Sequence, residues 1–421
     1  MEATRIRLAE GVHLTYLPAR KFKTSLLSAQ FVTPLRRETA GANALLAAVL
    51  RRGTVSCPDM GALSAKMDNL YDASIDYTVR KKGENQCVGF VASFIDDRYA
   101  PGGERLLEPA AALLGELVCD PVTYHGRFVP EYFESEKTNL LEAIRSLIND
   151  KRDWADSRLL RALCDGEAYA VPRLGDEETV DKLQALKVYT QYRDLISTAP
   201  LEIIYSGSAD LERVKQALAA AFATLPREEV RVISTAAPHV CRESVQYVED
   251  VLDVTQGKLA MGYRCSSDDY PAMVLANLIF GGTSNSKLFL NVRERLSLCY
   301  YASSNYVRSK GILTVSSGIE SADYQRALDE ILHQLQEVRD GHWEPWELEG
   351  ARSTMRSALT SLSDSQGALE NYCLGQAATG QSEDPETMQR LLDQVTPERI
   401  QAAAQSVTLD TVYFLHGKED A

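Results

Sequence analysis

The stretch FGGTSNSKLFLNVRERLSLCYYASSNY, residues 280–306, changes its hydrophobic pattern once along its length. A glycine pair lies near its start, and the apolar residues of about 285–295 have helical spacing. From 300 to 307 the pattern is typical of a strand, and a second strand over 312–317 follows after the turn residues SKG. The stretch therefore predicts a helix that leads directly into a β-hairpin.

This order of elements occurs twice in the 421 residues, which indicates two domains of one type. Strands are predicted at 24–33, 74–80, 86–95 and 201–208, and again at 258–265, 300–307, 312–317 and 411–417. Helices fill the intervening segments in the same order in both halves. We therefore predict two homologous α+β domains, 1–225 and 245–421, each a sheet with helices packed on one face. The segment 226–244 has two prolines and no clear periodicity, so it is predicted to be a linker.

The composition excludes several classes of protein. The 45 Lys and Arg against 59 Asp and Glu give a formal net charge of −14, which disfavours nucleic acid as a partner. Residues 1–52 alone carry nine basic and three acidic residues, which we interpret as a solvated face rather than a docking surface. No run of about 18 apolar residues predicts a membrane span. The first twenty residues lack an apolar signal core, so a cytoplasmic location is expected.

The common catalytic motifs are missing. The chain has no G-x-G-x-x-G, no P-loop and no G-x-S-x-G. None of the six histidines has a second within four residues, so no helical two-histidine zinc site is possible. No two of the eight cysteines form C-x-x-C. Cysteines scattered in this way are typically reduced, buried thiols. Cys299, beside a tyrosine pair, is the first of them to consider as a nucleophile.

The helix predicted within GANALLAAVLRRGT, residues 41–54, resembles the metal helix of the pitrilysin/insulinase zinc peptidases, the inverzincins. In that family the segment is similar to G-x-A-H-x-x-E-H-x-x-x-x-G-T, and its terminal glycines and threonine are kept here. The resemblance places the first zinc-binding His at Ala44, the catalytic Glu at Ala47 and the second His at Ala48. These positions share one helix face, and methyl groups can neither bind an ion nor deprotonate a water.

The family's third zinc ligand is a glutamate on a later helix, in a segment that resembles E-x-x-x-V-x-x-E. FESEKTNLLEAI, residues 133–144, is similar to it, and Glu142 takes the place of the ligand. Because its two histidine partners are absent, we expect Glu142 to be a surface or salt-bridged residue. The resemblance therefore predicts no bound zinc, no other cofactor and no catalytic residue in this chain.

The block at 280–306 is similar to the C-terminal block of the same family, G-G-G-x-x-S-x-L-F-x-x-x-R-E-x-x-x-L-x-Y-x-x-x-S. The resemblance implies that Arg293 and Tyr300 form a pair that reaches into a peptide cleft. A guanidinium and a phenol are suitable donors to peptide carbonyls and carboxylates. Gly281 and Gly282 have two interpretations: a turn between helices, since glycine permits positive φ, or a short version of the loop that guides substrate in the processing peptidases.

The resemblance covers nearly the whole chain and implies a clamshell of two mostly antiparallel sheets. Residues 21–54 and 80–87 resemble one bacterial branch in particular, the non-catalytic insulinase-like proteins associated with 5-aminopentanol modification of elongation factor P. We predict a catalytically silent, peptide-binding subunit whose partner is a zinc-bearing sister subunit, or a homodimer. The alternatives are a stand-alone peptide-binding or scaffold protein, and an enzyme that uses a cysteine or a carboxylate pair.

Overall fold

The computed structural model describes residues 3–235 and 242–418, and these divide into two compact units. Unit 1 comprises the described residues of Met1–Arg145, Val171–Ala236 and Leu362–Ser382. Unit 2 comprises those of Ser146–Ala170, Ala237–Ser361 and Glu383–Ala421. Part of the predicted linker, with His239 and Cys241, lies outside the described residues.

Unit 1 is built on a six-stranded sheet with the order β1-β2-β8-β3-β5-β4. Its strands are β1 (Thr4–Ala9), β2 (Val12–Pro18), β3 (Thr24–Pro34), β4 (Ser74–Lys82), β5 (Asn85–Ile95) and β8 (Leu201–Gly207). Only the β2–β8 pair of this sheet is parallel. A short ribbon of β6 (Thr123–Tyr124) and β7 (Arg127–Phe128) lies outside the sheet.

Unit 2 repeats this arrangement in a five-stranded sheet with the order β11-β12-β10-β13-β9. Its strands are β9 (Gln246–Val251), β10 (Gly257–Cys265), β11 (Cys299–Val307), β12 (Ile312–Ile319) and β13 (Val407–His416). The edge strand β9 runs parallel to β13, and the other pairs are antiparallel, as in the β4-β5-β3-β8-β2 part of the first sheet. The prediction of two like α+β units with mostly antiparallel sheets is confirmed.

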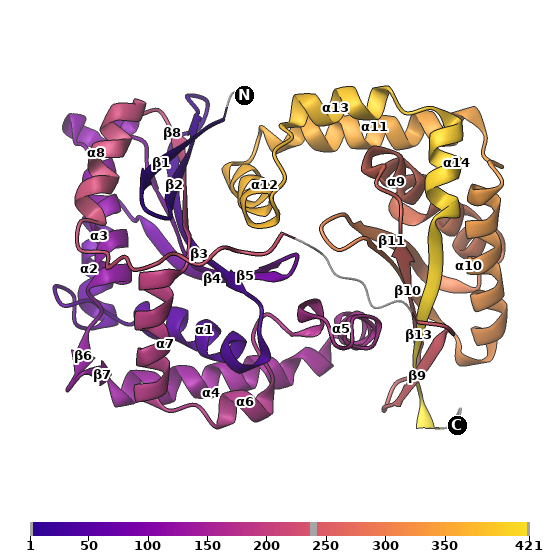
Figure 1. Ribbon diagram of the computed structural model, residues 1–421, viewed down its shortest axis with the longest axis horizontal. Helices are drawn as coiled ribbons and strands as arrows, with labels where there is room; N and C mark the ends of the chain where they lie inside the picture. Colours follow the sequence, from indigo (N-terminus) through magenta and orange to yellow (C-terminus); the bar gives the residue numbers. More distant parts are fainter. Residues whose placement is uncertain (1–2, 236–241, 419–421) are drawn as a thin grey trace. The chain divides into compact units, whose positions relative to one another are not determined.

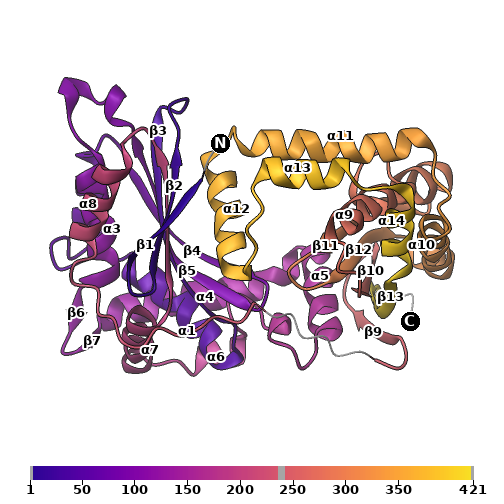
Figure 2. The same cartoon turned by 45° about the horizontal axis from the view of Figure 1, so that its top comes forward.

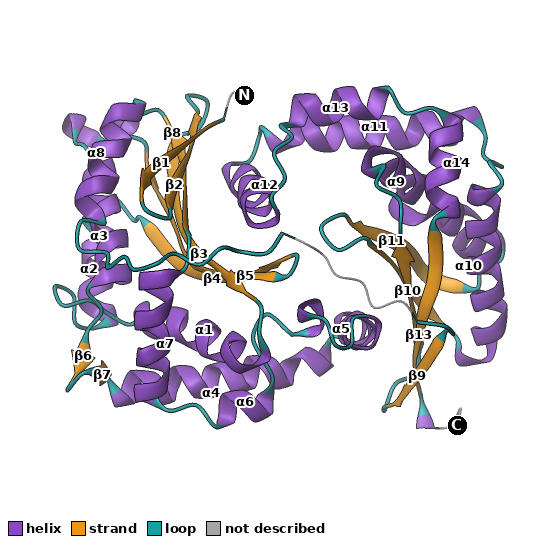
Figure 3. Cartoon of the chain, in the orientation of Figure 1, coloured by secondary structure: helices purple, strands orange, loops and turns teal. Residues whose placement is uncertain are grey.

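The helices of unit 1 lie mainly on one face of its sheet (Figure 3). Its helices are α1 (Arg37–Leu50), α2 (Met60–Asp68), α3 (Leu107–Cys119), α4 (Pro130–Ser146), α6 (Glu177–Asp181), α7 (Ala185–Thr198), α8 (Leu211–Ala221) and α12 (Gln366–Thr379). Unit 2 contains α5 (Lys151–Leu163), α9 (Tyr270–Asn277), α10 (Tyr324–Arg339), α11 (Pro345–Leu362), α13 (Pro385–Asp393) and α14 (Pro397–Gln405). Within residues 3–235 and 242–418, no helix has the length and apolar character that crossing a membrane requires.

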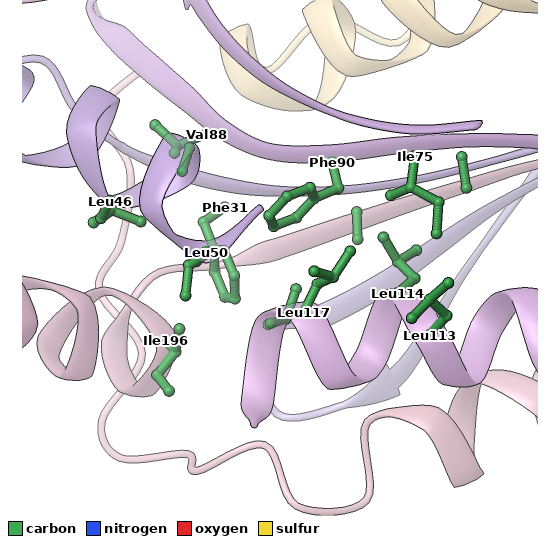
Figure 4. Close-up of a cluster of buried hydrophobic side chains, with 14 of the residues drawn as sticks. Phe31, Leu46, Leu50, Ile75, Val88, Phe90, Leu113, Leu114, Leu117 and Ile196 are labelled. Atoms are coloured by element: carbon green, nitrogen blue, oxygen red, sulfur yellow. The ribbon is translucent and has the colours of Figure 1, made fainter. Parts of the chain in front are cut away.

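Strand residues of unit 1 alternate between two buried faces. Phe31 of β3 joins the large core formed with α1, α3, α7 and α8 (Figure 4), whereas its neighbour Val32 belongs to a smaller cluster with α12. Ile203 and Ile204 of β8 divide in the same way. Because successive side chains of a strand point to opposite faces, an unbroken apolar run requires cover on both.

The second face of each sheet is covered by a helix from the other half of the sequence. Helix α12 lies beside the sheet of unit 1 (Figures 1 and 2), where Leu369 and Leu374 are buried. Helix α5 packs on β10 and β13 of unit 2, where Ala155 and Leu159 belong to one buried cluster with Tyr413. The predicted one-sided helical layer is thus completed by one helix on the opposite face. Each compact unit therefore includes a segment from the other half of the chain, and its bounds differ from those of the predicted domains 1–225 and 245–421.

In each unit, the segment that comes from the other half of the sequence carries a buried carboxylate, which pairs with a cation of that unit. Glu370 of α12 accepts two hydrogen bonds from Arg80 of β4, at 2.6 and 2.7 Å. Glu167, which follows α5, accepts one of 2.8 Å from Arg264 of β10 and forms an ion pair of 2.5 Å with Lys310. The side chains of both glutamates are at most 3% exposed, so the ion pairs are shielded from water.

The beginning of the predicted linker is fixed to unit 1. The Arg227 guanidinium donates hydrogen bonds of 2.9 to 3.1 Å to the carbonyls of Glu10, Gly11, Ile196 and Ala199. Burial lowers the pKa of Arg227, and the four carbonyls replace the water that the guanidinium loses. The linker therefore begins as an ordered part of unit 1.

Candidate functional site

Helix α1, the predicted counterpart of a metal helix, is buried and apolar. Every residue from Ala40 to Leu50 is buried, and Ala44, Ala47 and Ala48 are 2%, 1% and 6% exposed. The helix packs on α7 and on strands β4 and β5. Its alanine methyls have no lone pair for a metal, so this face does not fit a zinc ion. In the part of the chain that the structure describes, no three His, Cys, Asp or Glu side chains are grouped to hold a metal.

Buried amides, which the sequence analysis missed, fix α1 in place. Asn43 donates a 2.9 Å hydrogen bond to Gln86 of β5 and accepts one of 2.9 Å from Gln191 of α7. Gln86 in turn donates to the Ala40 carbonyl at 3.0 Å and to the Arg173 carbonyl at 2.6 Å. These amides satisfy one another, as buried polar groups must, and bind α1 to both neighbours.

Glu142, the predicted position of the third ligand, lies exposed on α4. The carboxylate of α4 that faces the end of α1 is Glu136, which is 9% exposed. It accepts hydrogen bonds from Arg52 and, at 3.2 Å, from Asn139. Ser135 accepts a second bond from Arg52, at 2.9 Å. The buried carboxylate of α4 is therefore neutralised by an arginine.

Arg293 and Tyr300 come together where a wide helix leads into an edge strand. Residues Leu288–Arg295 form a π-helix, with the Leu296 amide bonded to the Asn291 carbonyl at 3.0 Å. Such helices are rare and frequently occur at functional sites. Ser297, with φ of +52°, turns the chain into β11, which begins at Cys299. This turn allows Arg293 of the helix and Tyr300 of the strand to line the same hollow.

Both side chains line one hollow of about 400 Å³. The Arg293 guanidinium lies 4.6 Å from the centre of the Phe289 ring and 3.6 Å from the Glu294 carboxylate. The Tyr300 ring is largely exposed, and its hydroxyl donates a 2.8 Å hydrogen bond to Glu320. This bond to a carboxylate raises the pKa of Tyr300, so the phenol stays protonated and remains a donor.

Glu320 also lines this hollow, and the sequence analysis did not find it. It follows directly after β12, and β11 pairs with β12 so that Cys299 lies opposite Ile319. Tyr300 and Glu320 are therefore neighbours across the β-hairpin. The only signal in the sequence was the hairpin itself, whose register could not be read from its pattern.

Cys299 also lines the hollow but is poorly suited to be a nucleophile. It is 7% exposed, and burial raises the pKa of its thiol. Reactive cysteines have lowered pKa values and exposed sulfur atoms. The structure therefore argues against cysteine chemistry at this position.

Gly281 and Gly282 end a first π-helical segment, Leu278–Gly282, and neither has positive φ. Glycine is needed here because a side chain would have no space. A methyl group added at Gly281 would lie 2.8 Å from the Ser304 amide nitrogen and 2.6 Å from a Leu288 methyl. The glycine thus allows the helix to approach β11 closely, which neither of the two sequence interpretations foresaw.

We expect Gly281→Ala to lower the free energy of unfolding by about 1–3 kcal/mol, because the added methyl overpacks this contact. Gly350→Ala in α11 is the matched control, since nothing lies within 4 Å of the added methyl. That change should be neutral or should stabilise by about 0.5–1 kcal/mol through helix propensity. Chemical denaturation of both variants tests the expectation. Equal stability of Gly281→Ala and the wild type would contradict the packing role.

The chain is similar to proteins of one peptidase family. The family model described as Peptidase M16 inactive domain matches residues 182–355. A Bacillus subtilis protein named probable inactive metalloprotease YmfF is 33% identical over 417 residues, covering 98% of this chain and 97% of that protein. The uncharacterized zinc protease SCO5738 of Streptomyces coelicolor is 24% identical over 330 residues, covering 76% and 72%.

Solved structures match the fold over its full length. A conserved protein from Enterococcus faecalis superposes with a TM-score of 0.90 and 27% identity, covering 99% of both chains. A peptidase M16 inactive domain from Pseudomonas fluorescens superposes with a TM-score of 0.80 and 18% identity, again over 99% of both. At that identity the second similarity shows the fold alone.

Proposed function

Because the chain belongs to the M16 peptidase family, we propose that it is the peptide-binding subunit of a heteromeric zinc metallopeptidase whose metal lies in a partner. The chain itself is a non-catalytic homologue of the family's proteases. One combination carries the proposal. The helix α1 presents buried methyl groups at Ala44, Ala47 and Ala48, while Arg293 and Tyr300 line an open hollow.

The chemistry of the hollow suits peptide binding. Arg293 offers several N–H donors, and its guanidinium lies over the Phe289 ring, 4.6 Å from the ring centre. Tyr300 offers an exposed phenol, whose hydroxyl donates to Glu320 in the free protein. Peptide carbonyls are the natural acceptors for such donors. In this proposal the hollow orients the chain, and cleavage occurs at the metal of the partner.

The partner that fits this role is a zinc-bearing member of the same family. A second copy of this chain would bring the same alanines and therefore no metal ligands on α1. A homodimer would be a peptide-binding assembly without hydrolysis, which corresponds to the scaffold alternative. Purification from the native host, with identification of the bound protein and a peptidase assay before and after chelation, separates the two.

We expect Arg293→Ala to lower peptide cleavage by the reconstituted pair about 10- to 100-fold. The change removes a charge-assisted contact worth about 1.5–3 kcal/mol, and about 1.4 kcal/mol is a factor of ten. Tyr300→Phe removes one hydroxyl and should cost up to about tenfold. Both side chains are substantially exposed, so melting temperatures should stay near that of the wild type. Steady-state kinetics and thermal denaturation of the same samples measure both quantities.

Arg295→Ala is the matched control. Arg295 lies two residues after Arg293 on the same helix, is 64% exposed and does not line the hollow. Its removal should leave both cleavage and melting unchanged. Normal cleavage by Arg293→Ala with a lowered melting temperature would contradict the substrate role and assign Arg293 to structure alone.

A further inference from the structure

The sheet of unit 2 lacks one strand that the sheet of unit 1 has. In unit 1, β2 pairs with β8 on one side and with β1 on the other. In unit 2, β9 takes the place of β2, since it runs parallel to β13 as β2 runs parallel to β8. Across residues 3–235 and 242–418, no strand pairs with the other side of β9. In this part of the chain, β9 is therefore an open margin of its sheet (Figure 1).

Backbone groups of β9 point to the open side. The amide of Leu252, directly after β9, donates to the His416 carbonyl of β13 at 3.1 Å. Successive residues of a strand direct their backbone groups to opposite sides, so the even-numbered residues of β9 face β13. The N–H and C=O groups of Tyr247, Glu249 and Val251 then face away from the sheet. A row of this kind can hydrogen-bond an added strand.

The side chains of the same three residues are exposed on one face of the sheet. Tyr247 and Val251 are 61% and 44% exposed, and Glu249 lies between them. Their neighbour Val248 packs against the cluster of α5. Because side chains alternate along a strand, the three exposed side chains lie on the face opposite α5. An added strand would cover both apolar side chains.

Strand β1 shows what covers such a margin in this molecule. It runs antiparallel to β2, with Ile6 opposite Leu14. Ile6 and Leu8 pack against the core of unit 1, and Leu14 beside them is fully buried. The segment that suits β9 therefore runs antiparallel to it and has apolar residues opposite Tyr247 and Val251.

We infer that β9 binds an extended segment of another protein as an added antiparallel strand, with a lysine or arginine opposite Glu249. Side chains directly opposite each other on paired strands interact, and opposite charges there are favourable. A second copy of this chain fits less well, because pairing Tyr247 with Val251 of the copy would place two Glu249 carboxylates opposite each other. The surface lies at the other end of the strand order from β11, which carries Tyr300, so it is independent of the proposed peptide hollow.

The test uses fluorescein-labelled, N-acetylated and C-amidated heptapeptides in which threonines alternate with valine, lysine and valine. Fluorescence anisotropy with the full chain measures the affinity. A peptide with glutamate in place of lysine should bind about threefold to tenfold more weakly, because like charges then face each other. A lysine peptide N-methylated at the lysine and at both valines should bind at least about tenfold more weakly, because it lacks the N–H donors that face β9.

Glu249→Lys should reverse the preference, so that the glutamate peptide binds more tightly than the lysine peptide. Glu349→Lys is the matched control, because it makes the same charge change at an exposed position of α11 in unit 2. It should leave the preference for the lysine peptide unchanged. Tyr247→Ser removes apolar surface and should weaken both peptides about equally. All three positions are exposed, so melting temperatures should stay near that of the wild type.

Failure of the lysine peptide to bind would overturn the inference, as would equal binding of the N-methylated peptide. A preference for lysine that survives Glu249→Lys would overturn it too. Sedimentation velocity tests the other occupant. A wild-type dimer that Tyr247→Ser dissociates would assign β9 to a second copy of this chain and would likewise contradict the inference, whereas a monomer with the expected peptide preference supports it.

Discussion

The triple change Ala44→His, Ala47→Glu and Ala48→His is expected to destabilise unit 1 and not to create a zinc peptidase. The three methyls are at most 6% exposed in a helix whose surroundings are already packed. Each new polar group that is buried without a partner costs about 1–3 kcal/mol, and the added volume costs more. Domains are typically stable by about 5–15 kcal/mol, so the variant should lose much of its stability. Chemical denaturation and elemental analysis for zinc measure the result.

The matched control is an apolar triple, Ala44→Val, Ala47→Leu and Ala48→Val, which adds bulk without polarity. It should lie between the wild type and the polar triple in free energy of unfolding, which separates overpacking from desolvation. The wild-type protein is the reference for the metal analysis, and we expect it to contain no stoichiometric zinc. A stable polar triple variant that binds one zinc per chain and cleaves peptides would contradict this account. It would show that the helix face of Ala44, Ala47 and Ala48 has room for a metal site.

Glu167→Ala should lower the free energy of unfolding of unit 2 by about 3–5 kcal/mol. The side chains of Glu167 and Lys310 are 1% and 0% exposed, and their charged atoms lie 2.5 Å apart. Arg264, whose side chain is 10% exposed, bonds to the same carboxylate at 2.8 Å. Removing the glutamate leaves two buried cations with less counter-charge. Urea denaturation measures the loss, and proteolysis of 146–170 shows whether that segment detaches first.

Glu212→Ala is the control with the same chemistry at the surface. Glu212 pairs with Lys215 at 2.8 Å on α8, but the two side chains are 68% and 38% exposed. Exposed pairs contribute about 0–1 kcal/mol, so this variant should stay close to the wild type. A loss below about 1 kcal/mol for Glu167→Ala would show that the buried cluster is not what holds the segment to the sheet.

Local pattern was sufficient for most of the fold. The helix over 40–50, the strands over 24–33 and 258–265, and the hairpin of β11 and β12 lie where the sequence placed them. These elements depend on the spacing of apolar residues and on turn residues, which act over a few positions. The repeated order of elements then predicted two like units. Strands β1, β2 and β9 were missed, and the edge strands β1 and β9 have half-exposed residues that give a weak pattern.

The candidate site was predicted in part. The block at 280–306 named Arg293 and Tyr300, and the structure places both at one hollow. Glu320 and the reason for Gly281 were missed, since one depends on strand register and the other on a close backbone approach. Neither is expressed in the spacing of apolar residues.

The sequence by itself determined that α1 is an apolar helix and that the chain has two α+β units. Tertiary structure decided which half of the sequence covers each sheet. Lys310 shows the difference: it lies in the SKG turn between β11 and β12, where a lysine is expected to be solvated, yet its side chain is fully buried. Glu167, which arrives from the first half of the chain, provides the counter-charge that makes this burial tolerable. Contacts between residues more than a hundred positions apart depend on how helices and strands pack, and the local spacing of apolar residues does not determine them.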